Sequence, residues 1–287
     1  MTVPVLRFAP SPNGRLHLGH AYSALLNARV AERLGGRLLL RIEDIDVTRC
    51  REEFVEAIAD DLAWLGLKFE QPVRRQSEHF GDYIAAFATL QERGVVYRCF
   101  CSRRDMAETV RLAELAGRKS WHRDPDGAPL YPGTCRQSHA GHVESAQPHT
   151  WRIDMAAALR MVPEKLAYRR LEAHGEISLQ TVDPSRWGDA VIVRREIPTS
   201  YHLSVVVDDA LQGITHVVRG QDLEASTDLH VLLQHLLGLP TPIYHHHALI
   251  TDQQGDKLAK SRFSETLGEL RERGMSAADV RRMLGFG

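Results

Sequence analysis

The chain has 287 residues, of which 43% are hydrophobic and 25% are charged, and its formal net charge is −1. This composition is that of an ordinary globular protein with one large domain or two modest ones, and it excludes a global basic field, so a nucleic-acid partner would need a local basic face. No apolar run approaches the roughly 20 residues that span a bilayer, and the N-terminus lacks a signal-peptide pattern, so we expect a cytoplasmic protein without a membrane partner.

The N-terminal segment predicts a βαβ unit. Val3 to Phe8 alternates between apolar and polar residues and favours a strand. Apolar residues then recur at helical spacing from Leu18 to Leu34, and Gly35-Gly36 ends this helix. Arg37 to Ile42 is a short apolar run of the buried-strand type. Strand, helix and strand in this order indicate a parallel sheet and an α/β fold.

The middle of the chain departs from this pattern. Glu52 to Leu65 and Tyr83 to Arg93 again show helical periodicity. From Cys99 to about Pro148 the sequence is rich in Arg, His, Gly, Pro and Asp, and its apolar pattern is broken. We interpret this stretch as an insertion. Alternating segments resume from Trp151 to Leu179.

The remaining elements predict a return to the core. Ala190 to Val193, Ser204 to Val207 and His216 to Arg219 are expected to be strands of that core. Ser226 to Leu237 is expected to form a helix, and amphipathic helices close the chain after Lys257.

A histidine motif lies where the first predicted strand turns into the first predicted helix. From Arg7 to His20 the chain reads RFAPSPNGRLHLGH. A helix N-terminus gathers unpaired backbone N–H groups and the positive end of the helix dipole, so it attracts phosphate. Gly19 would let a nucleotide approach the backbone, and His17 and His20 could donate to an α-phosphate that gains charge under attack. The alternative is a turn whose two surface histidines cap a helix.

A lysine motif lies near the other end of the chain. Lys257-Leu258-Ala259-Lys260-Ser261 follows the Gly- and Asp-containing loop from Asp252 to Asp256. We expect Lys260 to bind the triphosphate, where a cation offsets the charge on the leaving pyrophosphate. Taken alone, the segment is more typical of a mobile surface loop. Together the two motifs indicate an enzyme that activates a carboxylate with ATP and Mg²⁺.

Three cysteines of the expected insertion suggest a metal site. Cys99 and Cys101 form a close pair, and Cys135 lies further along the same stretch. Tetrahedral zinc takes four ligands, and chemistry alone favours a histidine as the fourth, because phenolate is a rare zinc ligand. The candidates are Tyr131, His122 and His139. The alternative is three buried cysteines without a metal.

The two motifs have counterparts in one enzyme family. Arg7 to His20 resembles the HIGH signature of class I aminoacyl-tRNA synthetases, in the glutamate-specific form that begins Arg-Phe-Ala-Pro-Ser-Pro, and Lys257 to Ser261 is similar to the partner KMSKS signature. Arg41 to Asp46 and Val218 to Asp222 also match the glutamyl branch. The resemblance covers essentially the whole chain in order. It implies a Rossmann-type class I catalytic domain.

The resemblance also implies which residues bind substrate. Glutamate has two carboxylates and one ammonium group, so Arg7 and Arg219 could clamp a carboxylate, Tyr201 could donate a hydroxyl, and Glu43 could accept the ammonium. The alternative is that Glu43 and Arg219 pair with other charges of the core. The implied glutamate-binding positions are Arg7, Phe8, Ala9, Pro10, Ser11, Glu43, Tyr201 and Arg219. The implied catalytic positions are His17, His20, Lys257 and Lys260, and the ATP-binding ones are His17, Gly19, His20, His246 and Lys260.

Two further predictions rest on the family. The run from Tyr131 to Cys135 resembles the Tyr-x-x-x-Cys element of zinc-binding glutamyl-type enzymes, which implies a structural Zn²⁺ held by Cys99, Cys101, Tyr131 and Cys135. His246 lies in the run His245-His246-His247. Consecutive histidines point in different directions, so we interpret the run as structural, with a minor ATP-site role for His246.

Where the chain ends bears on the expected substrate. Ordinary glutamyl-tRNA synthetases carry a further helical domain that reads the anticodon, whereas this chain ends at Gly287, soon after its second motif. That matches a truncated paralogue family, the glutamyl-Q tRNA(Asp) synthetases. By resemblance, these form glutamyl-adenylate from glutamate and ATP without tRNA, and then esterify the glutamate onto the queuosine base in the anticodon loop of tRNA(Asp). Alternatives are a minimal glutamyl-tRNA synthetase that charges the tRNA 3′ end, a small-molecule adenylate-forming ligase, and a non-catalytic RNA-binding relative.

The expected organisation follows from these motifs. Residues 1–98 and 151–238 would be the two halves of the catalytic domain, and residues 99–150 the zinc-binding insertion between them. Residues 239–287 would hold the lysine motif and a helical segment like the family's stem-contact region. We expect no anticodon-binding domain, and a monomer.

Overall fold

The structure is a computed structural model that describes residues 3–117, 120–137, 147–250 and 265–287. Its strands are β1 (Val5–Phe8), β2 (Arg37–Ile42), β3 (Glu70–Arg75), β4 (Val96–Cys99), β5 (Thr150–Ile153), β6 (Ala167–Leu171), β7 (Ile177–Thr181), β8 (Val191–Val193), β9 (His216–Gly220) and β10 (Ile243–His247). Its α-helices are α1 (Leu18–Arg33), α2 (Glu52–Trp64), α3 (Phe80–Glu92), α4 (Arg103–Leu115), α5 (Thr134–Gln137), α6 (Met155–Arg160), α7 (Tyr201–Leu211), α8 (Ser226–Leu237), α9 (Leu267–Glu272) and α10 (Ala277–Met283).

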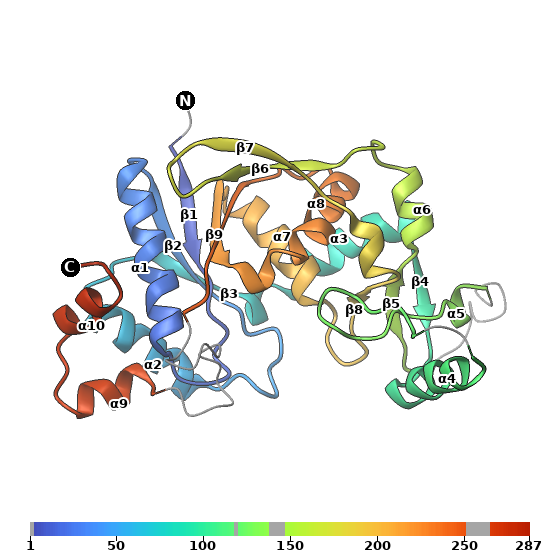
Figure 1. Cartoon of the computed structure of the whole chain (residues 1–287), viewed down its shortest axis with the longest axis horizontal. Coiled ribbons are helices and arrows are strands. Elements are labelled where there is room, and N and C mark those ends of the chain that lie inside the picture. The colour runs from blue at the N-terminus through green and yellow to red at the C-terminus, as the bar shows by residue number, and fades with distance from the viewer. Residues whose placement is uncertain (1–2, 118–119, 138–146, 251–264) are drawn as a thin grey trace.

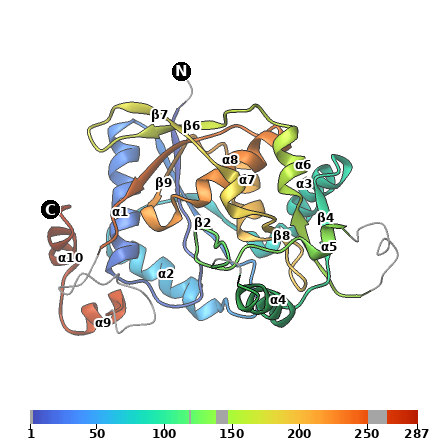
Figure 2. The ribbon, with the colours of Figure 1, turned by 45° about the vertical axis from the view of Figure 1, so that its right-hand side comes forward.

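The molecule is elongated along the horizontal axis of Figure 1, with α1 and α2 toward one end and α4 and α5 at the other. Helices α9 and α10 return to the end formed by α1 and α2 (Figures 1 and 2). Apolar side chains of this returning segment, among them Leu267, Leu270 and Val280, share a buried cluster with Leu25 of α1 and Leu62 of α2. The C-terminal region is therefore packed onto the N-terminal half of the molecule.

Seven described strands form the main sheet, in the order β3-β2-β1-β9-β10-β6-β7. Neighbours from β3 to β6 are parallel, and β7 is antiparallel to β6. From β1 the chain adds β2 and then β3 on one side, whereas β10 is added to β9 on the other side. The direction in which strands are added therefore switches across the β1–β9 pair. In open α/β sheets a ligand-binding crevice forms at the carboxyl ends of the strands at such a switch point.

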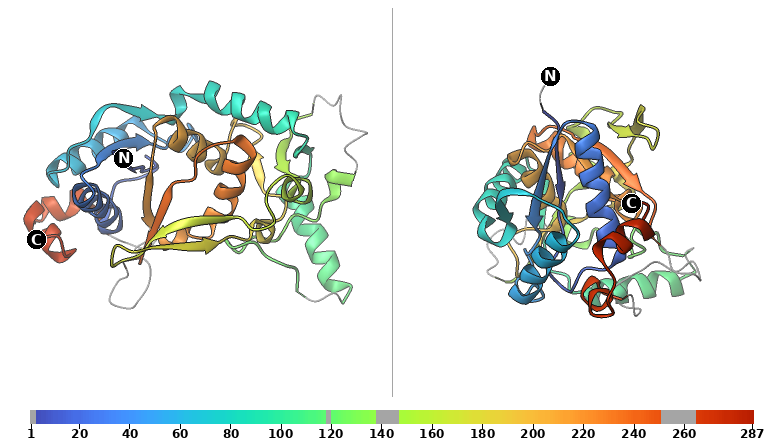
Figure 3. Two further views of the ribbon diagram at one scale, coloured as in Figure 1. Left: turned by 90° about the horizontal axis from the view of Figure 1, so that it is seen from above. Right: turned by 90° about the vertical axis from the view of Figure 1, so that its left-hand side faces the viewer.

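Side-chain alternation along β1 and β9 sets what faces each side of the sheet. Leu6 and Val218 pack with Ala31 of α1 on one face. Val5 and Val217 belong to the large core that includes α3, α7 and α8, and Figure 3 shows the sheet between these helices and α1. Because side chains alternate along a strand, Arg7 lies on the same face as Val5, and Arg219 on the same face as Val217. Both arginines therefore point toward α7 and α8.

A second, antiparallel sheet contains β4, β5 and β8. Cys99, the last residue of β4, is paired with Thr150, the first residue of β5. The segment between these two residues, with α4 and α5, therefore leaves and re-enters the sheet at neighbouring positions. That geometry fits an insertion, although the domain boundaries expected from the sequence remain predictions.

Most predicted elements are confirmed, with two corrections. Ser204 to Val207 is not a strand but part of α7, which begins after its N-cap Ser200. Residues 203–209 of this helix are all buried, so the run lacks the periodicity that marks a helix with one exposed face. Ala190 to Val193 does contain a strand, but β8 lies in the small sheet rather than the main one.

Two neighbouring glycines end the first helix, as predicted. Gly35 has φ +60°, a left-handed conformation that ends helices and favours glycine. A Cβ on Gly36 would lie 2.7 Å from the carbonyl oxygen of Pro4, so this residue lets β2 start close to the beginning of β1. In the described part of the chain, no helix has the length and apolar character needed to cross a membrane.

Candidate active site

A cavity of about 520 Å³ opens at the carboxyl ends of β1 and β9, at the switch point of the main sheet. All eight residues expected to bind glutamate line it, namely Arg7, Phe8, Ala9, Pro10, Ser11, Glu43, Tyr201 and Arg219. Three of the residues expected at the ATP site also line it, namely His17, Gly19 and His20. Residues from three separate parts of the sequence thus share one cavity.

The histidine motif forms the N-terminus of α1. His17 is the N-cap, and its Nδ1 accepts a hydrogen bond of 3.1 Å from the backbone N–H of Gly19. The Nδ1 of His20 accepts a 3.2 Å bond from the backbone N–H of His17, which completes a reciprocal capping box. A neutral ring that accepts at Nδ1 carries its proton on Nε2, so each imidazole has an N–H donor on its other nitrogen.

Gly19 has a local reason to be glycine. A Cβ there would lie 3.0 Å from Cε1 and 3.1 Å from Nδ1 of His17. A side chain at this position would push the His17 ring by a few tenths of an ångström from its capping position. The expected role in nucleotide approach is thus joined by a steric one, since Gly19 lets His17 fold back over the helix N-terminus.

Lys257 and Lys260 lie outside the described residues, as does the loop from 252 to 256 that precedes them. The described residues before that gap line the cavity, and those after it contact the histidine motif. Leu249 and Ile250 line it before the gap. After the gap, Thr266 forms a β-bridge with His17, and the N–H of Leu267 donates a 2.8 Å bond to the carbonyl of Leu16.

The three consecutive histidines of β10 have three different environments. His245 contacts the carbonyl of Leu171 through Nδ1 at 2.7 Å. His246 is 6% exposed and does not line the cavity; its Nε2 lies 3.3 Å from Nε of Arg219. His247 does line the cavity, and it packs edge-on against Tyr22 of α1 at 5.1 Å between ring centres. His247 is therefore the histidine of this run that lies beside α1 at the cavity, and the minor ATP-site role expected of His246 remains a prediction.

Buried ion pairs anchor one wall of the cavity. Arg7 donates through Nε to Asp209 at 3.0 Å, and Arg41 donates to the same carboxylate at 2.7 Å. Arg41 is completely buried and also pairs with Glu43 at 3.0 Å and with Asp208 at 3.7 Å. Its three carboxylate neighbours raise the pKa of Arg41 although burial acts in the opposite direction. The cluster fixes Arg7 and Glu43 relative to each other.

Sequence reasoning missed Asp208 and Asp209 altogether. Asp208 accepts from Arg74 at 2.7 Å and from the amide of Gln76 at 2.7 Å, and Asp209 bridges Arg7 and Arg41. Two adjacent acidic residues in an otherwise apolar helix were the available signal, since unpaired carboxylates are rarely buried. Partners from such distant parts of the chain have no local pattern that would reveal them.

Arg219 contrasts with these paired arginines. It is 5% exposed, and its hydrogen-bond partners are neutral: Tyr201 Oη at 3.3 Å, His230 Nδ1 at 3.2 Å, Thr227 Oγ1 at 2.8 Å and His246 Nε2 at 3.3 Å. Among the described residues no carboxylate forms a salt bridge with it within 4.0 Å. Its guanidinium also lies 5.3 Å from the ring centre of Tyr244. Within the described part of the chain, a permanently charged group is thus held at the cavity wall without a carboxylate partner.

A second cavity of about 890 Å³ adjoins the first. Ser11, Glu43 and Tyr201 line both. The larger cavity extends from these residues toward α4 and the segment around Tyr131, and arginines including Arg194 contribute to its wall. A small pocket that can hold an amino acid thus communicates with a larger space.

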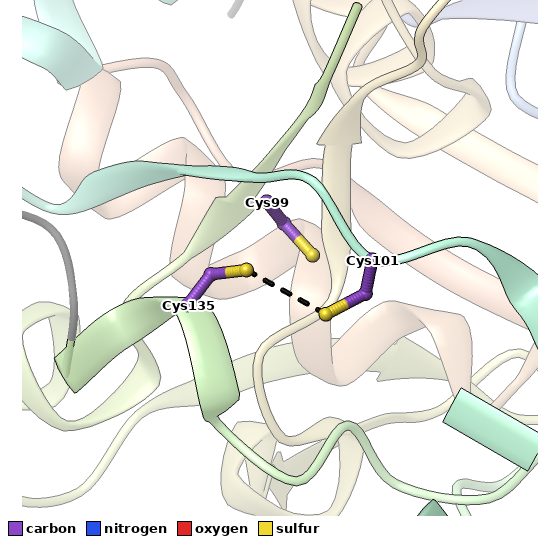
Figure 4. Close-up of side chains that lie close together, drawn as sticks. All are labelled: Cys99, Cys101 and Cys135. Carbon is purple, nitrogen blue, oxygen red and sulfur yellow. Dashed lines mark hydrogen bonds between the residues drawn. The ribbon is translucent and has the colours of Figure 1, made fainter. Parts of the chain in front are cut away.

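The three cysteines of the expected metal site converge. Cys99 is the last residue of β4, Cys101 lies two residues after it, and Cys135 belongs to α5. Their Sγ atoms lie within 4.8 Å of one another (Figure 4). Cys101 and Cys135 are the pair joined by a dashed line, at 3.5 Å between sulfurs. Cys50 lies elsewhere, with its Sγ 4.0 Å from Oγ of Ser11.

Tyr131 lies at this cluster. Its Oη is 3.4 Å from Sγ of Cys101 and accepts a 2.8 Å bond from the backbone N–H of Cys135. The backbone N–H of Phe100 points at Sγ of Cys135 at 3.4 Å. Such donors stabilise anionic thiolate and phenolate ligands, so the donor set suits a zinc ion. His122, an alternative fourth ligand, is exposed and is not part of the cluster, and His139 lies outside the described residues.

Comparisons with known proteins agree with this geometry. Residues 3–284 match the family of tRNA synthetases class I (E and Q), catalytic domain. The glutamyl-Q tRNA(Asp) synthetase of Rhodobacter capsulatus is 46% identical over 287 residues, which cover 98% of this chain and 100% of that protein. Glutamate–tRNA ligase 2 of Nitrosococcus oceani is 38% identical, over 93% of this chain and 56% of that protein.

A solved structure shows the same fold. The crystal structure of a glutamate tRNA ligase from Elizabethkingia meningosepticum in complex with its amino acid superposes with a TM-score of 0.78, at 24% identity. The match covers 99% of this chain and 60% of that one. The chain therefore belongs to the class I tRNA synthetases of the E and Q group, and its resemblance to the glutamyl-Q tRNA(Asp) synthetases and its Rossmann-type class I catalytic fold are confirmed.

Proposed function

We propose that this enzyme activates glutamate with ATP and then transfers it to the queuosine base of tRNA(Asp). The observation that carries the first half is Arg219, a buried cation at the wall of the smaller cavity that pairs with no carboxylate of the described residues. Glutamate has a net charge of −1, so it would neutralise the site on binding. Glutamine is neutral and nearly isosteric, and would leave the buried charge uncompensated.

The remaining residues of the pocket suit a zwitterionic amino acid. Arg7 is held in place by Asp209 and could bind one carboxylate. Glu43 lines the same cavity with a side chain 12% exposed, and could accept the ammonium group. Burial raises the pKa of Glu43, while Arg41 and Arg7 oppose that effect and favour the charged form. Tyr201 could donate its hydroxyl to a carboxylate.

The ATP site of the proposal is the N-terminus of α1. Its backbone N–H groups and helix dipole attract phosphate, and His17 and His20 would donate from Nε2 to the oxygens of the α-phosphate. The glutamate carboxylate would attack that phosphorus in line, releasing pyrophosphate and leaving glutamyl-adenylate. Mg²⁺ would supply charge neutralisation on the phosphates. Lys257 and Lys260 are proposed to share this role, because the chain lines the cavity just before their segment and contacts His17 just after it.

The acceptor in the second step is the part that rests on relatives. The Rhodobacter protein, which this chain matches over the whole of that protein's length, is named a glutamyl-Q tRNA(Asp) synthetase. A ring hydroxyl of queuosine would attack the activated carbonyl, and AMP would leave. The larger cavity beside Glu43 and Tyr201 offers room for such an acceptor.

We further propose that Cys99, Cys101, Cys135 and Tyr131 hold a structural Zn²⁺. The ion would tie β4 to α5 and fix the wall of the larger cavity, to which Cys101 and Tyr131 contribute. The cytoplasmic location, the monomeric state and the four-part division of the chain remain predictions.

A comparison of tRNA substrates tests the proposed acceptor. The enzyme is incubated with radiolabelled glutamate, ATP and tRNA(Asp) that either carries or lacks queuosine, and with tRNA(Glu). We expect label only on the queuosine-containing tRNA(Asp), and after nuclease digestion we expect it in the fragment that holds the anticodon loop rather than at the 3′-terminal adenosine. Equal labelling of both forms of tRNA(Asp), or labelling of tRNA(Glu), would favour a minimal glutamyl-tRNA synthetase. Glutamate-dependent ATP–pyrophosphate exchange without transfer to any tRNA would favour a small-molecule ligase.

A further inference from the structure

Two histidines that no sequence motif contains connect Arg219 to the larger cavity. His230 of α8 is 1% exposed, and its Nδ1 lies 3.2 Å from NH1 of Arg219. Its Nε2 lies 3.2 Å from Nδ1 of His202 on α7. His202 lines the larger cavity. The chain His202–His230–Arg219 therefore runs from one cavity to the other through the core.

The direction of every bond in this chain is fixed by Arg219. A guanidinium only donates, so Nδ1 of His230 must be an acceptor and its proton must lie on Nε2. That Nε2–H then donates to Nδ1 of His202, whose own proton must lie on Nε2. Each ring is a neutral Nε2–H tautomer. A doubly protonated His230 would turn an N–H toward Arg219 and break the first bond.

The other partners of Arg219 obey the same constraint. Nε of Arg219 lies 3.3 Å from Nε2 of His246, and the hydroxyl of Thr227 lies 3.1 Å from the same nitrogen. Because NH2 of Arg219 donates to Thr227 Oγ1 at 2.8 Å, the hydroxyl proton is left to donate to His246. Nε2 of His246 is then an acceptor, and this ring is the opposite tautomer, with its proton on Nδ1.

The electrostatic environment keeps these rings neutral. Burial, followed by the charge of Arg219, lowers the pKa of His202 to about 4 and that of His246 to about 2, and lowers the pKa of His230 well below its ordinary value. An aspartate or glutamate in any of these positions would also accept from Arg219, but it would supply a counter-ion. The core uses neutral acceptors instead.

We propose that His230, supported by His202, is a positioning residue that orients Arg219 through a one-way chain of neutral imidazoles, so that the counter-ion of Arg219 is a carboxylate of the substrate. This inference rests on the proposed glutamate activation and adds how the pocket selects an anionic amino acid. The chain holds the guanidinium in place without satisfying its charge.

An isosteric pair of variants tests this point. His230→Asn keeps an acceptor oxygen at the position of Nδ1, whereas His230→Asp puts a carboxylate at the same place. We expect the asparagine variant to keep the KM for glutamate in ATP–pyrophosphate exchange within about threefold of wild type, because a neutral acceptor remains. We expect the KM for glutamate of the aspartate variant to be roughly 30-fold or more above that of the asparagine variant. The new carboxylate would pair with Arg219 and so take the place of the substrate carboxylate as its counter-ion. The KM for ATP should be unchanged in both.

Equal glutamate KM values for the two His230 variants would overturn the inference. Asparagine and aspartate have the same shape and differ in charge, so a residue that only fills space would give the same KM with either. If the aspartate variant does not fold, the pair His246→Gln and His246→Glu places the same contrast at Nε of Arg219, and the same difference is expected.

The tautomers provide a readout that needs no substrate. Long-range ¹H–¹⁵N spectra of the wild-type protein should show His202 and His230 as Nε2–H and His246 as Nδ1–H. A protonated or Nδ1–H His230 would overturn the chain. Wild-type protein without glutamate-dependent exchange would instead reject the proposed function, and the spectra would still decide the orientation of the chain.

Discussion

Replacing Arg219 with methionine is the sharpest test of the glutamate pocket. The methionine side chain is unbranched like the aliphatic part of arginine and of similar length. The change therefore mainly removes the charge and the five N–H donors of a side chain that is 5% exposed. A bidentate guanidinium–carboxylate contact has two charge-assisted hydrogen bonds of about 1.5–3 kcal/mol each. Loss of both corresponds to about 3–6 kcal/mol, or roughly a 150- to 20,000-fold lower kcat/KM for glutamate.

The assay is ATP–pyrophosphate exchange at varied glutamate and saturating ATP. Arg219→Lys serves as a control, because it keeps the charge but loses the planar fork, and its effect should be smaller. The loss should leave the KM for ATP unchanged. Methionine also leaves the former acceptors Thr227 and His230 without this donor, so the thermal midpoint of each variant is measured to confirm folding at the assay temperature. A decrease of less than about fivefold in Arg219→Met would refute the idea that the substrate is the counter-ion.

Four further predictions follow from other parts of the structure. Lys260→Ala should abolish exchange while the circular dichroism spectrum stays unchanged; full exchange would show that this lysine does not act on the triphosphate. Cys101→Ser should lose Zn²⁺ by metal analysis of the purified protein and lower its thermal midpoint, and stoichiometric zinc would contradict the ligand set. Asp209→Asn should lower the free energy of unfolding in urea by about 3–5 kcal/mol, because Arg7 and Arg41 lose a buried counter-ion, whereas Asp82→Asn on the surface should cost under about 1 kcal/mol; similar effects would argue against the ion-pair network. The pKa of His202 is about 4 in the folded chain and about 6.5 when unfolded, so the unfolded chain binds more protons below pH 6.5. As the pH is lowered from 6.5 to 4, the free energy of unfolding of the wild type should therefore fall more steeply than that of His202→Asn. The difference in slope should reach up to about 1.4 kcal/mol per pH unit, and parallel curves would contradict this.

The parts of the site that could be predicted from the sequence are those whose residues lie together in one short segment. The run from Arg7 to His20 contains the end of β1, the turn and the start of α1, so a single stretch of sequence reveals both a substrate-facing strand end and a helix N-terminus. Helix α1 and strand β2 were predicted for the same reason, because their apolar periodicity and the glycines between them are local features.

What was missed depends on contacts between distant residues. Asp209 and His230 look like polar interruptions of apolar helices, and their roles appear only when α7 and α8 are packed against β1 and β9. The error in α7 arises from complete burial, which removes the helical alternation of apolar and polar residues. For His246 and His247, the sequence shows that they face opposite sides of a strand, but not which side is the cavity.

The central claim is that the cavity at the β1–β9 switch point activates glutamate. The most direct measurement is glutamate-dependent ATP–pyrophosphate exchange by the wild-type enzyme in the absence of any tRNA, with glutamine and aspartate tested alongside. We predict exchange with glutamate and little or none with glutamine, because only the anionic amino acid neutralises Arg219. Exchange that requires tRNA, or that proceeds equally well with glutamine, would contradict the account.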